Sequence, residues 1–169
     1  MDTKKLVLSA LFIAISFIGA NINLMGSIAF DSLPGFLAAL ILGPWYGAAI
    51  GLLGHLFTAL TSGFPLSLPI HLVIAVSMAI TMLCFGFSYR MLKEKVSEAA
   101  NLIITGAIGV LLNAPGSLAL SMSVMAVMIG REAALGLLVL LPMLTFASAA
   151  NIILAFAVFK SLARWGKFR

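Results

Sequence analysis

The sequence predicts an all-α membrane protein with six transmembrane helices and with both termini in the cytoplasm. Of the 169 residues, 63% are hydrophobic and 9% are charged, with a mean hydropathy of +1.21, whereas a soluble domain has about 25% charged residues. The few charges gather at the ends of apolar runs, as expected of chains that cross a bilayer. At about 20 residues per span no length remains for a soluble domain, so we expect one integral membrane domain over residues 1–169.

The first three expected helices are separated by strong helix breakers. An apolar run predicts a helix at 5–21, and this run is too long, and lacks the small-residue cleavage site, for a cleaved signal peptide. A short helix is expected at 33–42, ending at Gly43-Pro44, a pair typical of breaks. A third helix at 46–60 ends before the turn-forming run Ser62-Gly63-Phe64-Pro65.

The remaining three expected helices are longer. The fourth covers 69–89 and is followed by a charged stretch at 90–98. The fifth covers 101–129, with a break near 113–116 where the chain reads Asn-Ala-Pro-Gly, and the sixth covers 134–159, with a kink expected at Pro142. Residues spaced four apart, such as Gly47 and Gly51 or Ala147 and Asn151, are small enough for close helix packing, and we interpret them as internal contacts.

The distribution of basic residues gives the orientation. With six spans, nine of the ten Lys and Arg residues fall on one side of the membrane and Arg131 falls on the other. Cytoplasmic segments carry the excess of basic residues, so we expect this side to be the cytoplasm of a bacterial cell, with the chain in its cytoplasmic membrane. The nine are Lys4, Lys5, Arg90, Lys93, Lys95, Lys160, Arg164, Lys167 and Arg169.

The missing motifs narrow the function. The chain has no P-loop, no HExxH metal motif and no GxSxG nucleophile motif, so it neither binds ATP in a P-loop nor resembles those hydrolases. The lone Cys84 provides neither a disulfide nor a metal pair. The basic residues form no patch with polar or aromatic readers, so nucleic acid is not an expected partner. We therefore expect no cofactor, no metal and no catalysis.

Uncharged polar residues in the half of the bundle away from the basic residues are the candidate ligand contacts. His55 and Thr58 are three residues apart and share a helix face, while His71 lies just inside the next helix. Asn113 precedes the expected break, and such breaks often mark transporter binding sites. Buried polar groups in lipid need partners, so these side chains either bind one another or meet around a ligand.

Two loop residues complete the candidate substrate site. Asp31 offers an acceptor for a sugar hydroxyl or a ring donor, and the aromatic face of Phe64 suits a flat heterocycle. Phe64 is equally suited to anchoring the chain in lipid. A haem or metal site on His55 and His71 is disfavoured because the two lie at different depths with no third histidine.

The chain resembles the S components of energy-coupling factor (ECF) vitamin transporters. Ala10 and Ala14 match the AxxxA pattern on the first helix of that family. The stretch Asp31-Ser-Leu-Pro-Gly-Phe-Leu-Ala-Ala-Leu, then Leu42-Gly-Pro, Gly54-His55 and Thr58-Ala-Leu-Thr-Ser-Gly-Phe-Pro65, is similar to the subgroup for α-ribazole, a cobalamin precursor. The nickel and cobalt branch begins with Met-His, and Met1-Asp2 departs from it.

This resemblance implies a high-affinity subunit that captures a vitamin or vitamin precursor and topples in the membrane to release it. Ala10 and Ala14 would dock on a transmembrane coupling subunit, and two ATPase subunits would supply the energy. The substrate is then best assigned as α-ribazole, with another small heterocyclic vitamin as the alternative.

Two other functions remain open from the residues alone. An intramembrane hydrolase would use Ser117 or Ser121 with one of the histidines, although no nucleophile–base spacing supports it. A non-transporting membrane scaffold would use the small-residue faces only to assemble partners. Ligand binding distinguishes substrate capture from the scaffold.

Overall fold

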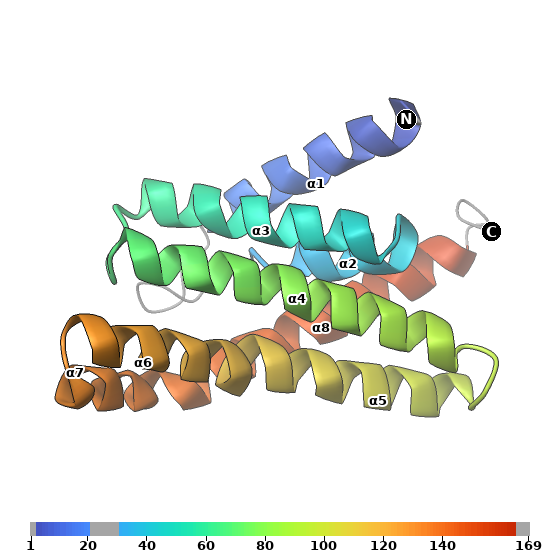
Figure 1. Cartoon of the computed structure of the whole chain (residues 1–169). Coiled ribbons are helices and arrows are strands. Elements are labelled where there is room, and N and C mark those ends of the chain that lie inside the picture. The colour runs from blue at the N-terminus through green and yellow to red at the C-terminus, as the bar shows by residue number, and fades with distance from the viewer. Residues whose placement is uncertain (1–2, 21–30, 165–169) are drawn as a thin grey trace.

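The computed structural model describes residues 3–20 and 31–164, in which every regular secondary-structure element is a helix (Figure 1). The all-α prediction is therefore confirmed, and each of the six expected segments overlaps a helical segment. The helices are α1 Thr3–Ala20, α2 Leu33–Ile41, α3 Pro44–Thr61, α4 Leu68–Leu92, α5 Glu98–Leu111, α6 Ser117–Met128, α7 Arg131–Gly136 and α8 Leu141–Arg164.

The segment at 113–116 departs from the expected break, because the helix continues through it. A π-helical turn, η1 (Leu112–Gly116), joins α5 to α6, and the three lie end to end along one line in Figure 1. Pro115 has no N–H to give to the helix, and the wider π turn accommodates it. Gly116 packs closely here, since an added Cβ would lie 3.1 Å from the carbonyl oxygen of Leu111.

Pro142 also lies at a change of helix type. A 3₁₀ turn, η2 (Leu137–Leu140), follows α7 and leads directly into α8, where Pro142 is the second residue. The first turn of a helix tolerates proline because the N–H groups there have no intrahelical acceptor. The irregularity expected at Pro142 is therefore a short 3₁₀ turn just before the proline.

Within residues 3–20 and 31–164, three helical stretches are long and apolar enough to cross a membrane: Leu68–Leu92, Glu98–Met128 and Arg131–Arg164. Helix α2 has nine residues and extends for about 14 Å, roughly half of the hydrocarbon thickness of a bilayer. The chain is thus built as a membrane protein, while the count of six spans stays a prediction.

Helix α2 forms the centre of the bundle, in contact with α1, α3, α4 and α8. All residues from 34 to 40 are buried. The ring of Phe36 meets that of Phe85 edge-on at 4.8 Å between centroids, and Phe85 stacks on Phe156 of α8 at 5.5 Å. Gly47 lets α3 approach α2, since a Cβ there would lie 2.6 Å from the Cβ of Ala39.

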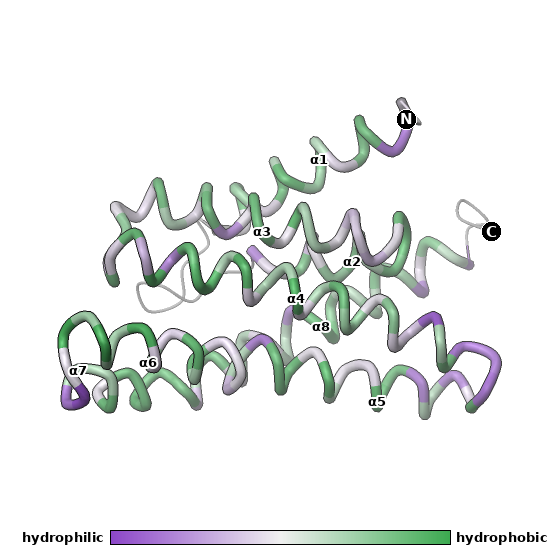
Figure 2. Tube along the Cα trace, in the orientation of Figure 1, coloured by the Kyte–Doolittle hydropathy of each residue, from purple (hydrophilic) through white to green (hydrophobic). Residues whose placement is uncertain are grey.

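Strongly hydrophilic residues gather at the two ends of the bundle (Figure 2). The start of α1, the connection between α4 and α5, and the last turn of α8 lie at one end, whereas Arg131 begins α7 at the other (Figure 1). At the first end Lys160 of α8 pairs with Glu98 of α5 at 3.0 Å. Lys167 and Arg169 lie outside the described residues. This separation reproduces the grouping of basic residues from which the orientation was predicted.

Candidate functional site

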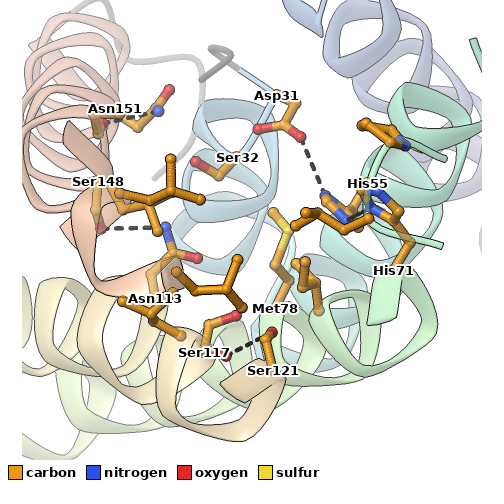
Figure 3. Close-up of a pocket in the computed structure, with 18 residues that line it drawn as sticks. Asp31, Ser32, His55, His71, Met78, Asn113, Ser117, Ser121, Ser148 and Asn151 are labelled. Carbon is orange, nitrogen blue, oxygen red and sulfur yellow. Dashed lines mark hydrogen bonds and ion pairs between the residues drawn. The ribbon is translucent and has the colours of Figure 1, made fainter. Parts of the chain in front are cut away.

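A cavity of about 300 Å³ opens between α3 and α4 on one side and η1, α6 and α8 on the other (Figure 3). Pro65 and Leu66 of the α3–α4 connection line it, and that connection lies at the end of the bundle opposite the termini (Figure 1). Apolar side chains form much of the wall, including Ile74, Met78 and Leu118. The polar lining residues are Asp31, Ser32, His55, His71, Asn113, Ser117, Ser121, Ser148 and Asn151.

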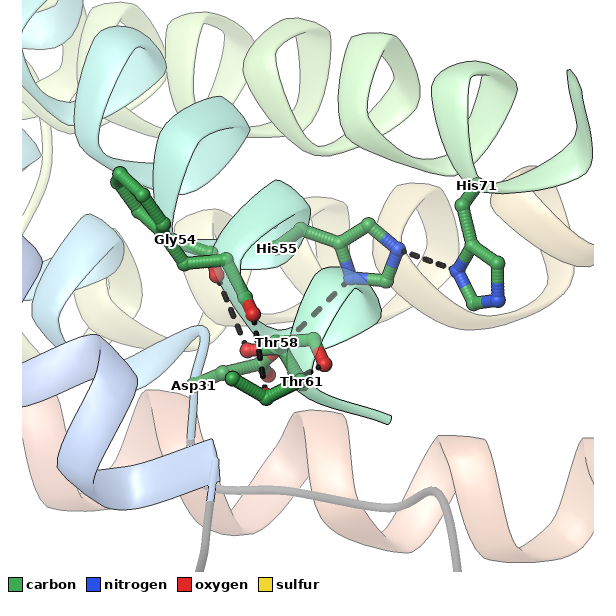
Figure 4. Close-up of polar contacts among 7 residues, drawn as sticks. Asp31, Gly54, His55, Thr58, Thr61 and His71 are labelled. Carbon is green, nitrogen blue, oxygen red and sulfur yellow. Dashed lines mark hydrogen bonds and ion pairs between the residues drawn. The ribbon is translucent and has the colours of Figure 1, made fainter. Parts of the chain in front are cut away.

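One side of the cavity carries a row of three titratable side chains (Figure 4). The Oδ2 atom of Asp31 lies 3.6 Å from Nδ1 of His55, and both side chains are only about one-eighth exposed, at 13% and 12%. The Nε2 atom of His55 lies 3.2 Å from Nδ1 of His71, so the expectation that the two histidines lie at different depths was wrong. The two imidazole rings are nearly parallel, with 29° between their planes. Three segments distant in sequence are thus joined by one line of polar contacts.

The last atom of this row has no partner among the described residues. His71 is 7% exposed, and its Nε2 atom is buried without a hydrogen bond. A buried polar atom left in this state costs about 1–3 kcal/mol. His71 therefore lies at the cavity wall with one unused hydrogen-bonding position.

The opposite side of the cavity presents amide and hydroxyl groups. Asn113, on η1, donates from Nδ2 to the hydroxyl of Ser148 on α8 at 3.2 Å (Figure 3). Asn151 lies one helical turn further along α8 and donates from Nδ2 to the carbonyl of Ala147 at 2.9 Å. The π turn, a feature often found at functional sites, thus places Asn113 against α8.

Two serines on α6 also line the cavity. The hydroxyl of Ser121 donates to the carbonyl of Ser117 within the same helix at 2.9 Å. That proton is therefore engaged by the backbone rather than by a histidine. This contact gives no support to Ser121 as a nucleophile.

Four of the six predicted substrate contacts, Asp31, His55, His71 and Asn113, line this one cavity. Thr58 is not among the lining residues, and its hydroxyl donates to the carbonyl of Gly54 in its own helix at 3.0 Å (Figure 4). Phe64 is not among them either.

Phe64 contacts the site indirectly, through His71. The two rings meet edge-on at 5.8 Å between centroids. Phe64 has a φ of 51° and Ser67 has a φ of 88°, a left-handed backbone region that costs side-chain-bearing residues about 1–3 kcal/mol. Two such residues in a six-residue connection show that this loop holds a defined shape over His71.

Several lining residues were not predicted from the sequence. Ser32 and Ser148 were not singled out, and Asn151 was interpreted as internal packing, although all three line the cavity. Ser148 and Asn151 are three residues apart and so share a helix face with the Ala147 position. That spacing indicates a shared polar face on α8, but it does not predict that this face is turned toward the cavity.

Within the described residues, no group of three or more His, Cys, Asp and Glu side chains is placed to hold a metal ion. Asp31 is the only carboxylate among the lining residues. The cavity thus offers hydrogen bonds on two sides and an apolar surface between them, a lining typical of small-molecule binding sites.

Long apolar helices around a partly polar cavity define a membrane-embedded ligand-binding protein. The chain matches the family model of the ECF transporter substrate-specific component over residues 4–163, and it belongs to that family. It is accordingly a substrate-binding subunit of a transporter and not an enzyme, and it works with an ECF module of a transmembrane coupling subunit and ATPases. Searches of curated proteins and of solved structures gave no match.

Proposed function

We propose that this chain captures a small, uncharged heterocyclic vitamin or vitamin precursor, with α-ribazole as the first candidate. The observation that carries the proposal is the convergence of Asp31, His55, His71 and Asn113 on one cavity of about 300 Å³. This volume is at the small end of the range for ligand pockets, which suits a nucleoside-sized molecule.

The chemistry of the cavity supports a nucleoside-like ligand. α-Ribazole joins a dimethylbenzimidazole ring to a ribose, so it has a flat apolar part, hydroxyl donors on the ribose and a ring-nitrogen acceptor on the imidazole ring. Ile74, Met78 and Leu118 offer apolar contact. Asp31 would accept from a sugar hydroxyl, and the Asn113–Ser148 pair retains donor capacity for a ring nitrogen.

A ligand screen tests this function. We expect α-ribazole to raise the unfolding temperature of the purified chain, because a ligand at 100 times its Kd adds about 2.7 kcal/mol to the stability of the folded state. Adenosine, thiamine, riboflavin and biotin serve as comparison ligands. Native mass spectrometry of the protein as purified then identifies any small molecule that it retains.

The outcomes separate the alternatives. A shift with a different heterocyclic ligand would move the assignment to another vitamin. If no ligand in the panel changes the unfolding temperature and only lipid co-purifies, the scaffold interpretation replaces substrate capture.

The cavity is proposed to face the outside of a bacterial cell, with both termini in the cytoplasm. Glu94 and Glu132 provide a matched test, since both are exposed and lie at opposite ends of the bundle. In a Cys84→Ala background, we expect Glu132→Cys to react with a membrane-impermeant maleimide on intact cells. Glu94→Cys should react only after the membrane is permeabilised. The reverse pattern would invert the orientation, and neither variant removes a basic residue.

The face of α1 that carries Ala10 and Ala14 is proposed as the docking surface for the coupling subunit. Both alanines are exposed, whereas Ser16, on another face of the helix, is fully buried against Gly54 of α3. The two small side chains therefore lie away from the chain's own bundle, where they permit a close approach by another helix.

A further inference from the structure

The polar contacts along the row Asp31–His55–His71 run in one donor-to-acceptor direction. That direction determines whether the last nitrogen of the row donates or accepts a hydrogen bond. A neutral imidazole carries one proton, so one ring nitrogen donates while the other accepts. When two neutral rings are hydrogen-bonded in a row, the position of the proton on the first ring therefore determines whether the last nitrogen of the second ring is protonated or bare.

Asp31 determines this direction. An ionised carboxylate only accepts hydrogen bonds, and its Oδ2 atom lies 3.6 Å from Nδ1 of His55. A proton on that Nδ1 is attracted to the carboxylate, whereas a bare lone pair there would face a negative charge. In a neutral His55 the proton therefore lies on Nδ1, and Nε2 accepts.

The second ring follows from the first. Since Nε2 of His55 accepts, the hydrogen bond of 3.2 Å to His71 requires Nδ1 of His71 to donate. A neutral His71 then has no proton on Nε2, the same buried atom that lacks a partner among the described residues. The row then ends in a bare acceptor nitrogen, buried on a residue that lines the cavity.

We infer that Nε2 of His71 is a hydrogen-bond acceptor for an N–H or O–H group of the substrate, and that Asp31 keeps it in that state through His55. This inference rests on the proposed function and adds a requirement for the substrate. The molecule must carry a donor at its end near the histidines, which a ribose hydroxyl of α-ribazole supplies. Asp31 acts here as a positioning residue, and its Oδ1 atom stays available to accept from the ligand.

The chain is well suited to a direct measurement, because it has only two histidines. Labelling histidine with ¹⁵N gives four ring-nitrogen signals, and nitrogen chemical shifts separate bare from protonated positions. The experiment uses the full chain in lipid bilayers, with a purification tag that contains no histidine, near pH 8. The signals are assigned with His55→Gln.

We expect Nδ1 of both rings to be protonated and Nε2 of His71 to be bare. In Asp31→Asn this preference should be lost, with both tautomers of His71 populated, and Asp31→Glu should restore it. A proton on Nε2 of His71 in the unmodified chain would overturn the inference. The protonation of His71 Nε2 in the unmodified chain tests the inference by itself, even where a variant fails to fold.

Addition of α-ribazole tests the ligand requirement. The signal of the bare Nε2 atom should move as it accepts a hydrogen bond, and tri-O-methyl α-ribazole, which has no hydroxyl donor, should bind at least about 10-fold more weakly. Bound α-ribazole that leaves this signal unchanged would refute the inference while the proposed function stands. A bare Nε2 atom with no binding of α-ribazole would instead refute the choice of ligand and retain the acceptor site.

Discussion

Replacing His71 with phenylalanine is expected to weaken the binding of α-ribazole by about 10- to 100-fold, while in the unliganded protein the loss of the hydrogen bond to His55 is offset by the removal of the unpartnered Nε2 atom. A buried ligand donor that loses its acceptor costs about 1–3 kcal/mol, which corresponds to that range of affinity. Phenylalanine keeps an aromatic ring against Phe64 and removes the unpartnered Nε2 atom. The measurement is isothermal titration calorimetry on the purified chain, beside its thermal unfolding without ligand.

The control is Leu72→Phe, which adds a ring at the neighbouring position of α4. Leu72 is about half exposed on the outside of the bundle and is not among the lining residues. We expect that variant to bind α-ribazole like the unmodified chain. Unchanged affinity in His71→Phe would remove this residue from the site, and equal losses in both variants would point to a general disturbance of α4.

The double variant Ala10→Leu/Ala14→Leu should reduce uptake in cells to background while the purified chain keeps its affinity for α-ribazole. The two alanines are exposed on α1, and leucine at both positions would hold an approaching helix away from the backbone. Neither residue lines the cavity. The measurements are uptake of labelled substrate by cells that also produce the ECF module, and recovery of that module with the tagged chain.

Ala119→Leu is the matched control, because it makes the same substitution at an exposed position on α6. It should leave both uptake and recovery of the module unchanged. Full uptake in the double variant would place the docking surface elsewhere. Loss of ligand binding in the purified double variant would instead show that α1 supports the cavity.

Together these results would separate two functions of the chain, ligand recognition and docking on the ECF module. The cavity between α3, α4, η1, α6 and α8 holds the residues proposed to recognise the ligand, while the exposed face of α1 holds those proposed to engage the module. Because the chain has no P-loop, the energy for uptake would come from the module engaged at that proposed surface. A variant that loses ligand binding and keeps docking, or the reverse, therefore shows that the two surfaces act separately.

Some of the residues that line the cavity were predicted from the sequence and others were not, for one physical reason. His55, His71 and Asn113 were identified because polar groups in an apolar helix need partners. Thr58 has the same property but bonds to the carbonyl of Gly54, an option open to threonine in any helix. Ser148 and Asn151 were overlooked because a serine or asparagine among small residues is equally consistent with packing.

The sequence by itself determined that the chain is an all-helical membrane protein, where its basic residues gather, and where its helices are irregular. Those properties follow from composition and from short-range patterns, which depend on neighbours along the chain. The tertiary structure decided which polar side chains share a cavity, that the segment at 113–116 is a π turn rather than a break, and that α2 is enclosed by its neighbours. These depend on the rotation and depth of each helix, which are set by contacts such as Gly47 with Ala39 between distant segments.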